Sequence, residues 1–472
     1  MPSTFLVVAI EELRYPFSSF AGFISGGIGI QSFHLVVGLI GIILVYITTL
    51  KRKSHLSYKL ALLVVATSPF NNPAYSLYAG FSLSELTGIA LLAFLIYGIF
   101  DGAFRLKSVT TENLLSGTIG FKLFLFFLLL AASIVSVSLW SITGLPYSFG
   151  LDTQPLVFIQ ANFRLLLATL SALILASAIK SSSTGWEVRD AYDCFSQVII
   201  LIFICQVLCY LVLFSGTTPY GTFLGAGFSL FPAFGAVSNE RGHLGRLICF
   251  FPGLISLLVA FMNHKYVSTV VSRSFIFAPA LIVPLSILSV ILTMSSSSLA
   301  LISSWFFSLL FLFAVRTLSL LRVSKGLMSK LLPALSALLV VATTFFDGLS
   351  ASFAKIIDLV VYSEYDGVRA LSIESLPFFW GTGYYGSSGR ESLPIKATDS
   401  GFSVSSEYFG ISYLIFLFLI GAFSVFLATK YLFRTGSSIA LLSAALCVQI
   451  CIFCLSEVSI GQYSMVFAWF LV

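Results

Sequence analysis

The stretch IGIQSFHLVVGLIGIILVYITTL, residues 28–50, decides the class of this protein, because it contains no Asp, Glu, Lys or Arg. As a helix rising about 1.5 Å per residue, it is long enough to cross about 30 Å of hydrocarbon. Similar stretches recur along the chain, which is 58% hydrophobic and only 9% charged. Soluble proteins carry about 25% charged residues. The sequence therefore predicts a protein that crosses a membrane many times.

The apolar runs are continuous and rich in Leu, Phe, Ile and Val, whereas the strands of a membrane barrel alternate apolar and polar residues in segments of about ten. We therefore expect an all-α polytopic integral membrane protein that forms a single transmembrane domain over 1–472, with about twelve transmembrane helices. The spans are expected near residues 28–50, 60–73, 77–100, 115–141, 163–180, 194–214, 246–262, 274–292, 299–320, 331–349, 408–429 and 438–458. The last stretch, 459–472, is too short to span alone and is expected to be part of a final helix or a re-entrant segment.

Basic residues predict the orientation, because short cytoplasmic loops retain Lys and Arg. When alternate loops are taken as cytoplasmic, they hold 16 of the 25 Lys and Arg residues. These loops are 51–59, 101–113, 180–193, 263–273, 316–330 and 430–437. Two polar loops, at 216–245 and 350–407, then face the opposite side, which suggests chemistry at an outer surface.

Several other classes are disfavoured. All seven cysteines fall in or beside apolar runs, so neither a disulfide framework nor a zinc site is expected. The chain has no phosphate-binding glycine loop of the nucleotide type, and it shows no internal repeat of the kind found in carriers. We expect no cofactor, no bound metal and no nucleic-acid partner.

Four short motifs stand in a recognisable order. S-N-E-R-G-H-L-G-R at 238–246 precedes one span, and L-T-M-S-S-S-S-L at 292–299 lies between two others. In the long loop, W-G-T-G at 380–383 is followed by E-Y-F-G-I at 407–411, which enters the next span. In order and spacing these motifs resemble those of O-antigen polymerases and the related O-antigen ligases, over residues 220–425. The family often has T-x-S-R in the second motif, where this chain has Ser296 or Ser297 in place of the Arg.

The resemblance implies a GT-C-like glycosyltransferase in the bacterial inner membrane, with a long periplasmic loop at 350–407 and an active site facing the periplasm. It implies a metal-independent, inverting polysaccharide polymerase of lipopolysaccharide synthesis. The expected substrates are oligosaccharides linked to undecaprenyl pyrophosphate in the lipid bilayer, with a chain-length regulator as a further partner. Departure of the pyrophosphate requires cations, and the acceptor hydroxyl requires a base.

Arginine suits the pyrophosphate best, because its planar fork pairs with phosphate oxygens and keeps its proton. Arg369 is the first candidate, since it stands where the family-like part of the long loop begins; a solvated loop charge is the alternative. Arg241 and Arg246, on either side of His243, are further candidates for binding substrate. Ordinary anchoring at the membrane interface is the alternative for both.

Three further residues are weaker candidates for binding substrate. Arg164 begins a span on the same side, and Arg390 lies in the long loop, where a solvated charge is the favoured alternative. Tyr384 is a candidate for stacking on a sugar ring, although aromatic residues also form the ordinary membrane belt.

The candidate bases are Glu240, His243 and Asp399, all expected near the outer interface. A salt bridge with a neighbouring arginine is the alternative role for Glu240. A hydrogen bond to a backbone carbonyl is the alternative for His243, and a turn cap is the favoured alternative for Asp399.

Three competing functions remain open. Related ligases use a histidine in the long outer loop, and 350–407 contains none, which favours a polymerase over an O-antigen ligase. A flippase for lipid-linked oligosaccharides would also need a basic cavity, but it predicts two-fold internal similarity and charges near mid-span. A scaffold for polysaccharide export predicts no effect from changing single outer arginines.

Overall fold

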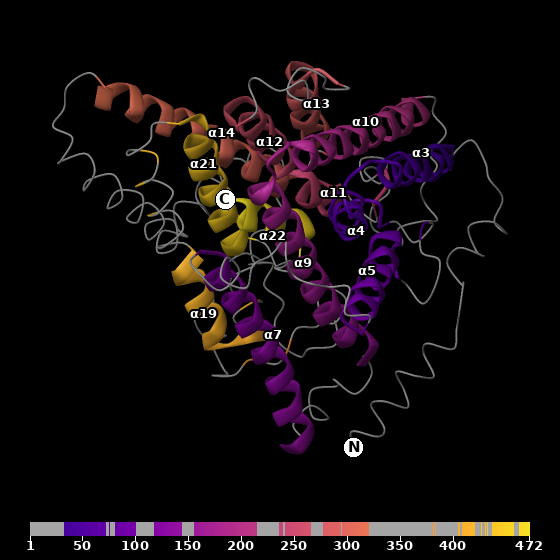
Figure 1. Ribbon diagram of the computed structural model, residues 1–472, viewed down its shortest axis with the longest axis vertical. Coiled ribbons are helices and arrows are strands. Elements are labelled where there is room, and N and C mark those ends of the chain that lie inside the picture. The colour runs from indigo at the N-terminus through magenta and orange to yellow at the C-terminus, as the bar shows by residue number, and fades with distance from the viewer. Residues whose placement is uncertain are drawn as a thin grey trace.

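The structure is a computed structural model. The described residues are 33–71, 75, 81–100, 118–143, 155–214, 236–238, 241–265, 277–293, 295–320, 381, 383, 405, 408–420, 426, 430, 432, 437–456 and 462–472. Their regular elements are helices (Figure 1). In chain order these are α3 (Phe33–Leu50), α4 (Leu56–Ala66), α5 (Leu83–Phe100), α7 (Thr118–Thr143), α9 (Pro155–Ser181), α10 (Trp186–Phe214), α11 (Arg241–Ile248), α12 (Phe251–Lys265), α13 (Pro279–Leu292), α14 (Ser296–Leu320), α19 (Ile411–Phe418), α21 (Ser438–Ser456) and α22 (Tyr463–Leu471).

The all-α prediction is confirmed over the described residues, where each predicted span overlaps a helix. The predicted span at 331–349 lies outside them. Five helices in the described ranges are long and apolar enough to cross a membrane. They are Phe33–Leu50, Phe158–Ser181, Trp186–Cys209, Ser298–Arg316 and His243–His264, the last of which takes in most of α11 and α12.

Several outer helices keep large apolar side chains exposed. On α14, Phe307 is 67% exposed and Phe311 is also exposed, and on α3 the same holds for Ile40 and Leu44. Apolar faces of this extent are rare on soluble monomers. Hydrocarbon chains of a bilayer would cover them without loss of hydrogen bonds, which agrees with a membrane-embedded protein.

Two short helices form the buried centre. α4 has eleven residues and α22 has nine, all of which are buried in α22. At about 14 Å, α22 is too short to cross a membrane alone. It packs instead against α9, α21, α4 and α11 (Figure 1). In these two helices the continuous apolar sequence reflects burial against protein. The pattern of apolar residues alone does not distinguish such burial from burial in lipid.

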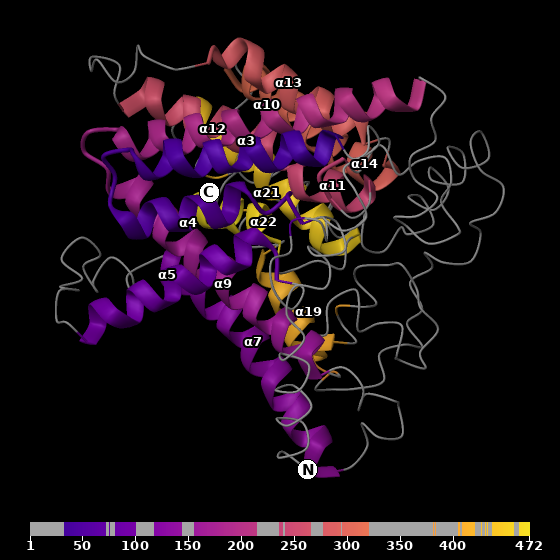
Figure 2. The same cartoon turned by 90° about the vertical axis from the view of Figure 1, so that its right-hand side faces the viewer.

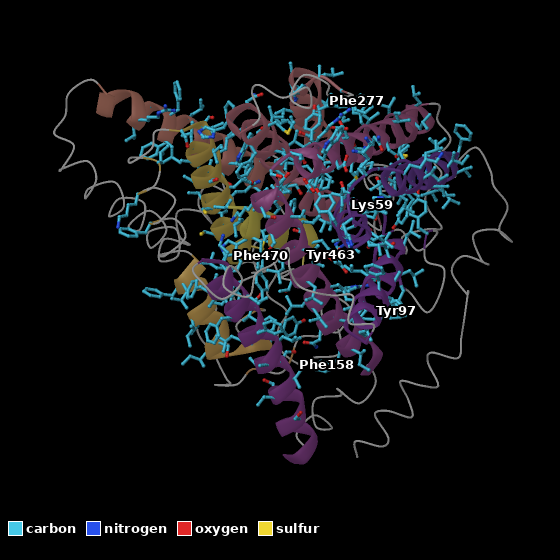
Figure 3. The ribbon with its side chains drawn as sticks, in the orientation of Figure 1. Lys59, Tyr97, Phe158, Phe277, Tyr463 and Phe470 are labelled. Carbon is cyan, nitrogen blue, oxygen red and sulfur yellow. The ribbon has the colours of Figure 1, made fainter. Side chains whose placement is uncertain are left out.

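A buried lysine and a partly buried one complete the end of α22. Lys122 Nζ donates to the carbonyl of Trp469 at 2.6 Å, and Lys180 Nζ donates to that of Phe470 at 3.0 Å. These carbonyls belong to the last helical turn, where cations also complement the negative end of the helix dipole. Figure 3 shows Phe470 and Tyr463 on this helix in the middle of the molecule.

The predicted span at 246–262 is interrupted, because α11 ends before α12 begins. Pro252 explains the break, since it has no N–H to donate to the carbonyl four residues earlier. Side chains of other helices donate hydrogen bonds to backbone carbonyls near the break. Ser464 Oγ donates to Leu247 O at 2.8 Å, and Gln449 Nε2 donates to Cys249 O at 3.0 Å. The backbone around the break is thus satisfied by protein rather than by water.

An ionic network joins the α3–α4 connection to the start of α10, where α3 and α10 lie side by side (Figure 2). Arg52 Nη1 lies 3.1 Å from Asp190 Oδ1 and 3.4 Å from Asp193 Oδ2, and Arg189 Nε lies 3.6 Å from Asp193 Oδ2. Ser54 donates a hydrogen bond to Asp190. The network fixes one end of the α3–α4 pair to α10.

Candidate functional site

The motifs at 238–246 and 292–299 lie against each other. Gly245 of α11 faces the end of α13 and the start of α14: an added Cβ would lie 2.8 Å from Thr293 Oγ1 and 2.6 Å from Ser298 Cβ. Real Cβ atoms do not approach other atoms so closely. Glycine at 245 therefore allows the two motif-bearing segments to touch.

The other two motifs also meet, through their backbones. The N–H of Gly383 in W-G-T-G donates to the carbonyl of Tyr408 in E-Y-F-G-I at 2.9 Å. Gly381 has a φ of +77°, and an added Cβ there would lie 2.7 Å from the nitrogen of Gly410. Glycine is the residue that adopts such a conformation at little cost. These two motifs, 24 residues or more apart in the sequence, thus form one junction.

Arg164 of α9 and the His243 and Arg246 residues of α11 form a basic cluster. His243 is partly buried, and both arginines lie within electrostatic range of its ring. Glu85 at the start of α5 pairs with Arg164 through its Oε1 atom and the arginine Nε. The Arg164 side chain is 42% exposed, whereas that of Glu85 is only 2% exposed. The cluster is therefore open to ligands at Arg164 and anchored to the protein at Glu85.

Glu85 is held by its own helix as well. The backbone N–H of Ser82 donates to Glu85 Oε2 at 2.7 Å, and the N–H of Glu85 donates to Ser82 Oγ at 3.4 Å. This is a capping box, in which two backbone donors of the helix start are satisfied reciprocally. One carboxylate oxygen thus caps α5 and the other orients Arg164. The sequence analysis missed Glu85, although S-L-S-E at 82–85 is a local signal for the cap.

The segment before α11 is anchored to the α4–α5 connection. Ser238 Oγ donates to Asn71 Oδ1 at 2.7 Å. Tyr75 from the same connection donates to the carbonyl of Leu35 in α3 at 3.2 Å. The first bond ties Ser238 to the end of the α4 region, and the second ties the α4–α5 connection to α3.

Three predicted site residues come together in this cluster, and the others lie elsewhere. Arg241 begins α11, but its side chain is outside the described part of the structure. Glu240, Asp399, Arg369, Arg390 and Tyr384 lie outside the described residues, as do most of the loops at 216–245 and 350–407. Their roles stay predictions.

The chemistry of the cluster is that of an anion site. Two guanidinium groups and an imidazole are opposed by one carboxylate, so the groups together carry a net positive charge at neutral pH. Arginine binds phosphate and carboxylate groups through paired hydrogen bonds. Comparisons of this chain with protein-family models, with curated proteins and with solved structures found no match.

Proposed function

We propose that this protein is a glycan polymerase of the bacterial inner membrane. It transfers a growing glycan from undecaprenyl pyrophosphate to a second lipid-linked repeat unit at the periplasmic side. The observation that carries the proposal is the basic cluster, in which Arg164, His243 and Arg246 converge from two helices. Support also comes from the contact of α11 with the serine-rich turn through Gly245.

In the proposed reaction, the acceptor hydroxyl attacks the anomeric carbon of the donor sugar from the side opposite the diphosphate. A new C–O bond forms as the bond to the diphosphate oxygen breaks, so the configuration inverts. Arg246 and Arg164 stabilise the negative charge that develops on the diphosphate. A base takes the proton of the hydroxyl, and the candidates are Glu240, His243 and Asp399.

The finer expectations belong to this proposal. They comprise about twelve spans, a GT-C-like arrangement, the periplasmic position of the loop at 350–407, and substrate contacts by Arg369, Arg241, Arg390 and Tyr384. An O-antigen ligase would use the same donor and would differ in its acceptor.

A flippase for lipid-linked oligosaccharides is the second candidate, and two features of the helices favour it. The span of α11 and α12 is broken, and α22 is a short helix buried inside the protein. Many carriers place such discontinuous helices at their substrate sites.

The test is an incubation of the purified protein, in liposomes, with one defined undecaprenyl-pyrophosphate oligosaccharide. We expect a ladder of increasing lengths on a gel, also in the presence of a chelator. Arg246→Ala should abolish the ladder, whereas Lys59→Ala, at a partly exposed lysine whose ammonium donates to the Leu50 carbonyl, should leave it intact.

Movement of the substrate across sealed vesicles without a ladder would favour the flippase. Attachment of the glycan to lipid A core, with no ladder, would identify a ligase. If Arg246→Ala still gave the full ladder, the basic cluster would not be the site of the reaction.

A further inference from the structure

The start of α22 contains a buried amide without a hydrogen-bond partner. Gln462 is the N-cap residue of this helix, is 4% exposed, and makes no side-chain capping bond. Neither its Oε1 nor its Nε2 atom has a hydrogen-bond partner in the described part of the chain. A buried polar group left unpaired is unfavourable and is therefore uncommon in native proteins.

This helix start adjoins α11, the helix that carries His243 and Arg246. Ser464, in the first turn of α22, donates from Oγ to the carbonyl of Leu247, the residue after Arg246. The first N–H groups of a helix have no partner within it, and they carry its positive dipole end. The positive end of α22 thus contacts α11 one residue after Arg246.

The opposite end of α22 is fixed by different groups. Lys122 and Lys180 donate to the carbonyls of Trp469 and Phe470, and Lys122 also lies over the Trp469 ring at 5.6 Å. The two lysines therefore bind carbonyl groups at the negative end of the helix, whereas the Gln462 side chain makes no capping hydrogen bond at the positive end. The two ends of α22 therefore differ, because the described contacts of charged side chains lie at its negative end.

We propose that the first turn of α22, together with Gln462 and Arg246, binds a phosphate group of a diphosphate-bearing lipid. Backbone N–H groups at helix starts bind phosphate in this way, and the Gln462 Nε2 supplies a further donor. The identification of this lipid as the sugar donor rests on the proposed function. The inference assigns its diphosphate to the junction of α22 and α11 and adds a residue, Gln462, to those that hold it.

The experiment uses the full chain in nanodiscs of zwitterionic lipid, with farnesyl pyrophosphate as the probe. Gln462→Glu keeps an N-cap side chain that suits the positive helix end, but its charge repels phosphate. We expect it to raise the Kd for farnesyl pyrophosphate at least about tenfold, which corresponds to a loss of about 1.4 kcal/mol of binding free energy. Gln197→Glu, which introduces the same charge on α10 where the amide accepts from Thr48, is the matched control and should leave the Kd unchanged.

Gln462→Met keeps the side-chain length without the amide, and covers the case in which a buried carboxylate prevents folding. We expect it to fold and to bind farnesyl pyrophosphate more weakly than the unchanged protein. Unchanged affinity in Gln462→Met, with a higher Tm, would mean that the amide only binds an ordered water, and would overturn the proposal. Equal weakening in Gln197→Glu would also overturn it.

Two comparison ligands identify the source of the phosphate. Farnesol should not bind, and nanodiscs containing phosphatidylglycerol should not compete with the probe; competition would assign the site to ordinary headgroups and overturn the proposal. Inorganic pyrophosphate should bind more weakly than the probe at a site that takes a lipid. The two proposals can fail separately. If the unchanged protein makes no glycan ladder but Gln462→Glu still weakens binding of the probe, the phosphate site stands and the polymerase is rejected. If Gln462→Glu gives a full ladder and binds the probe with unchanged affinity, the polymerase stands and the phosphate site is rejected.

Discussion

Two glycines set how closely the motif-bearing segments approach, but their neighbours differ in kind. Gly245 faces the side chains of Ser298 and Thr293, whereas Gly381 faces backbone atoms of Tyr408 and Gly410. We expect Gly245→Ala to destabilise the protein by about 1–3 kcal/mol through overpacking. Adding Ser298→Gly should recover part of this loss, because it removes the nearest atoms.

Gly381→Ala should be destabilising as well, since its φ of +77° also strains an L residue. Truncating a neighbouring side chain should not rescue Gly381→Ala, because the atoms nearest to the new Cβ belong to the backbone. Thermal unfolding of the purified variants in detergent measures both effects. If Ser298→Gly does not rescue Gly245→Ala at all, α11 and α14 are not in contact at this point.

The pair of Glu85 and Arg164 separates a structural from a functional role. Arg164→Leu leaves the nearly inaccessible Glu85 carboxylate without its ionic partner, so we expect a lower Tm. Adding Glu85→Gln removes the buried charge and should restore much of the Tm. It should not restore glycan synthesis, because the guanidinium is still missing. A double variant with a normal Tm and a full glycan ladder would show that Arg164 serves only the fold.

Sequence reasoning found part of the cluster and missed part of it. His243 and Arg246 belong to one short polar motif, so their proximity was evident from the residues themselves. Glu85 lies 79 residues before Arg164, and its pairing depends on how α5 meets α9. A capping box predicts the start of a helix, but it does not indicate what approaches the second carboxylate oxygen.

At the scale of elements, apolar runs in the sequence predicted where helices occur, but they did not predict whether a helix is buried in lipid or in protein. The run at 60–73 predicted a span, but α4 ends at Ala66 and its residues Leu62–Ala66 are fully buried in protein. Hydrophobic residues leave water equally well for lipid or for a protein core. Pro252 was a local signal for the break between α11 and α12, whereas the contacts around that break come from distant helices.

The ionic network at the start of α10 gives a prediction about how elements are held together. Arg52→Ala leaves Asp190 and Asp193 without a shared cation, and the side chains of all three are mostly buried. We expect a loss of roughly 3–5 kcal/mol, the range for breaking a buried ion pair by removing one partner. Unfolding by heat or denaturant measures it, with Lys59→Ala, at a partly exposed lysine, as the control. Equal stability of the two variants would contradict a role for this network in joining α4 to α10.

At the scale of the whole molecule, the exposed apolar faces agree with a membrane-embedded protein, but orientation rests on the distribution of Lys and Arg. The two ends of α3 test it. Phe33 and Lys51 are both exposed, and all seven native cysteines are buried, so background labelling should be low. In spheroplasts, a membrane-impermeant maleimide should label Phe33→Cys directly and Lys51→Cys only after lysis. Reversed labelling would place the basic cluster on the cytoplasmic side, and labelling of both from outside would mean that α3 does not span the membrane.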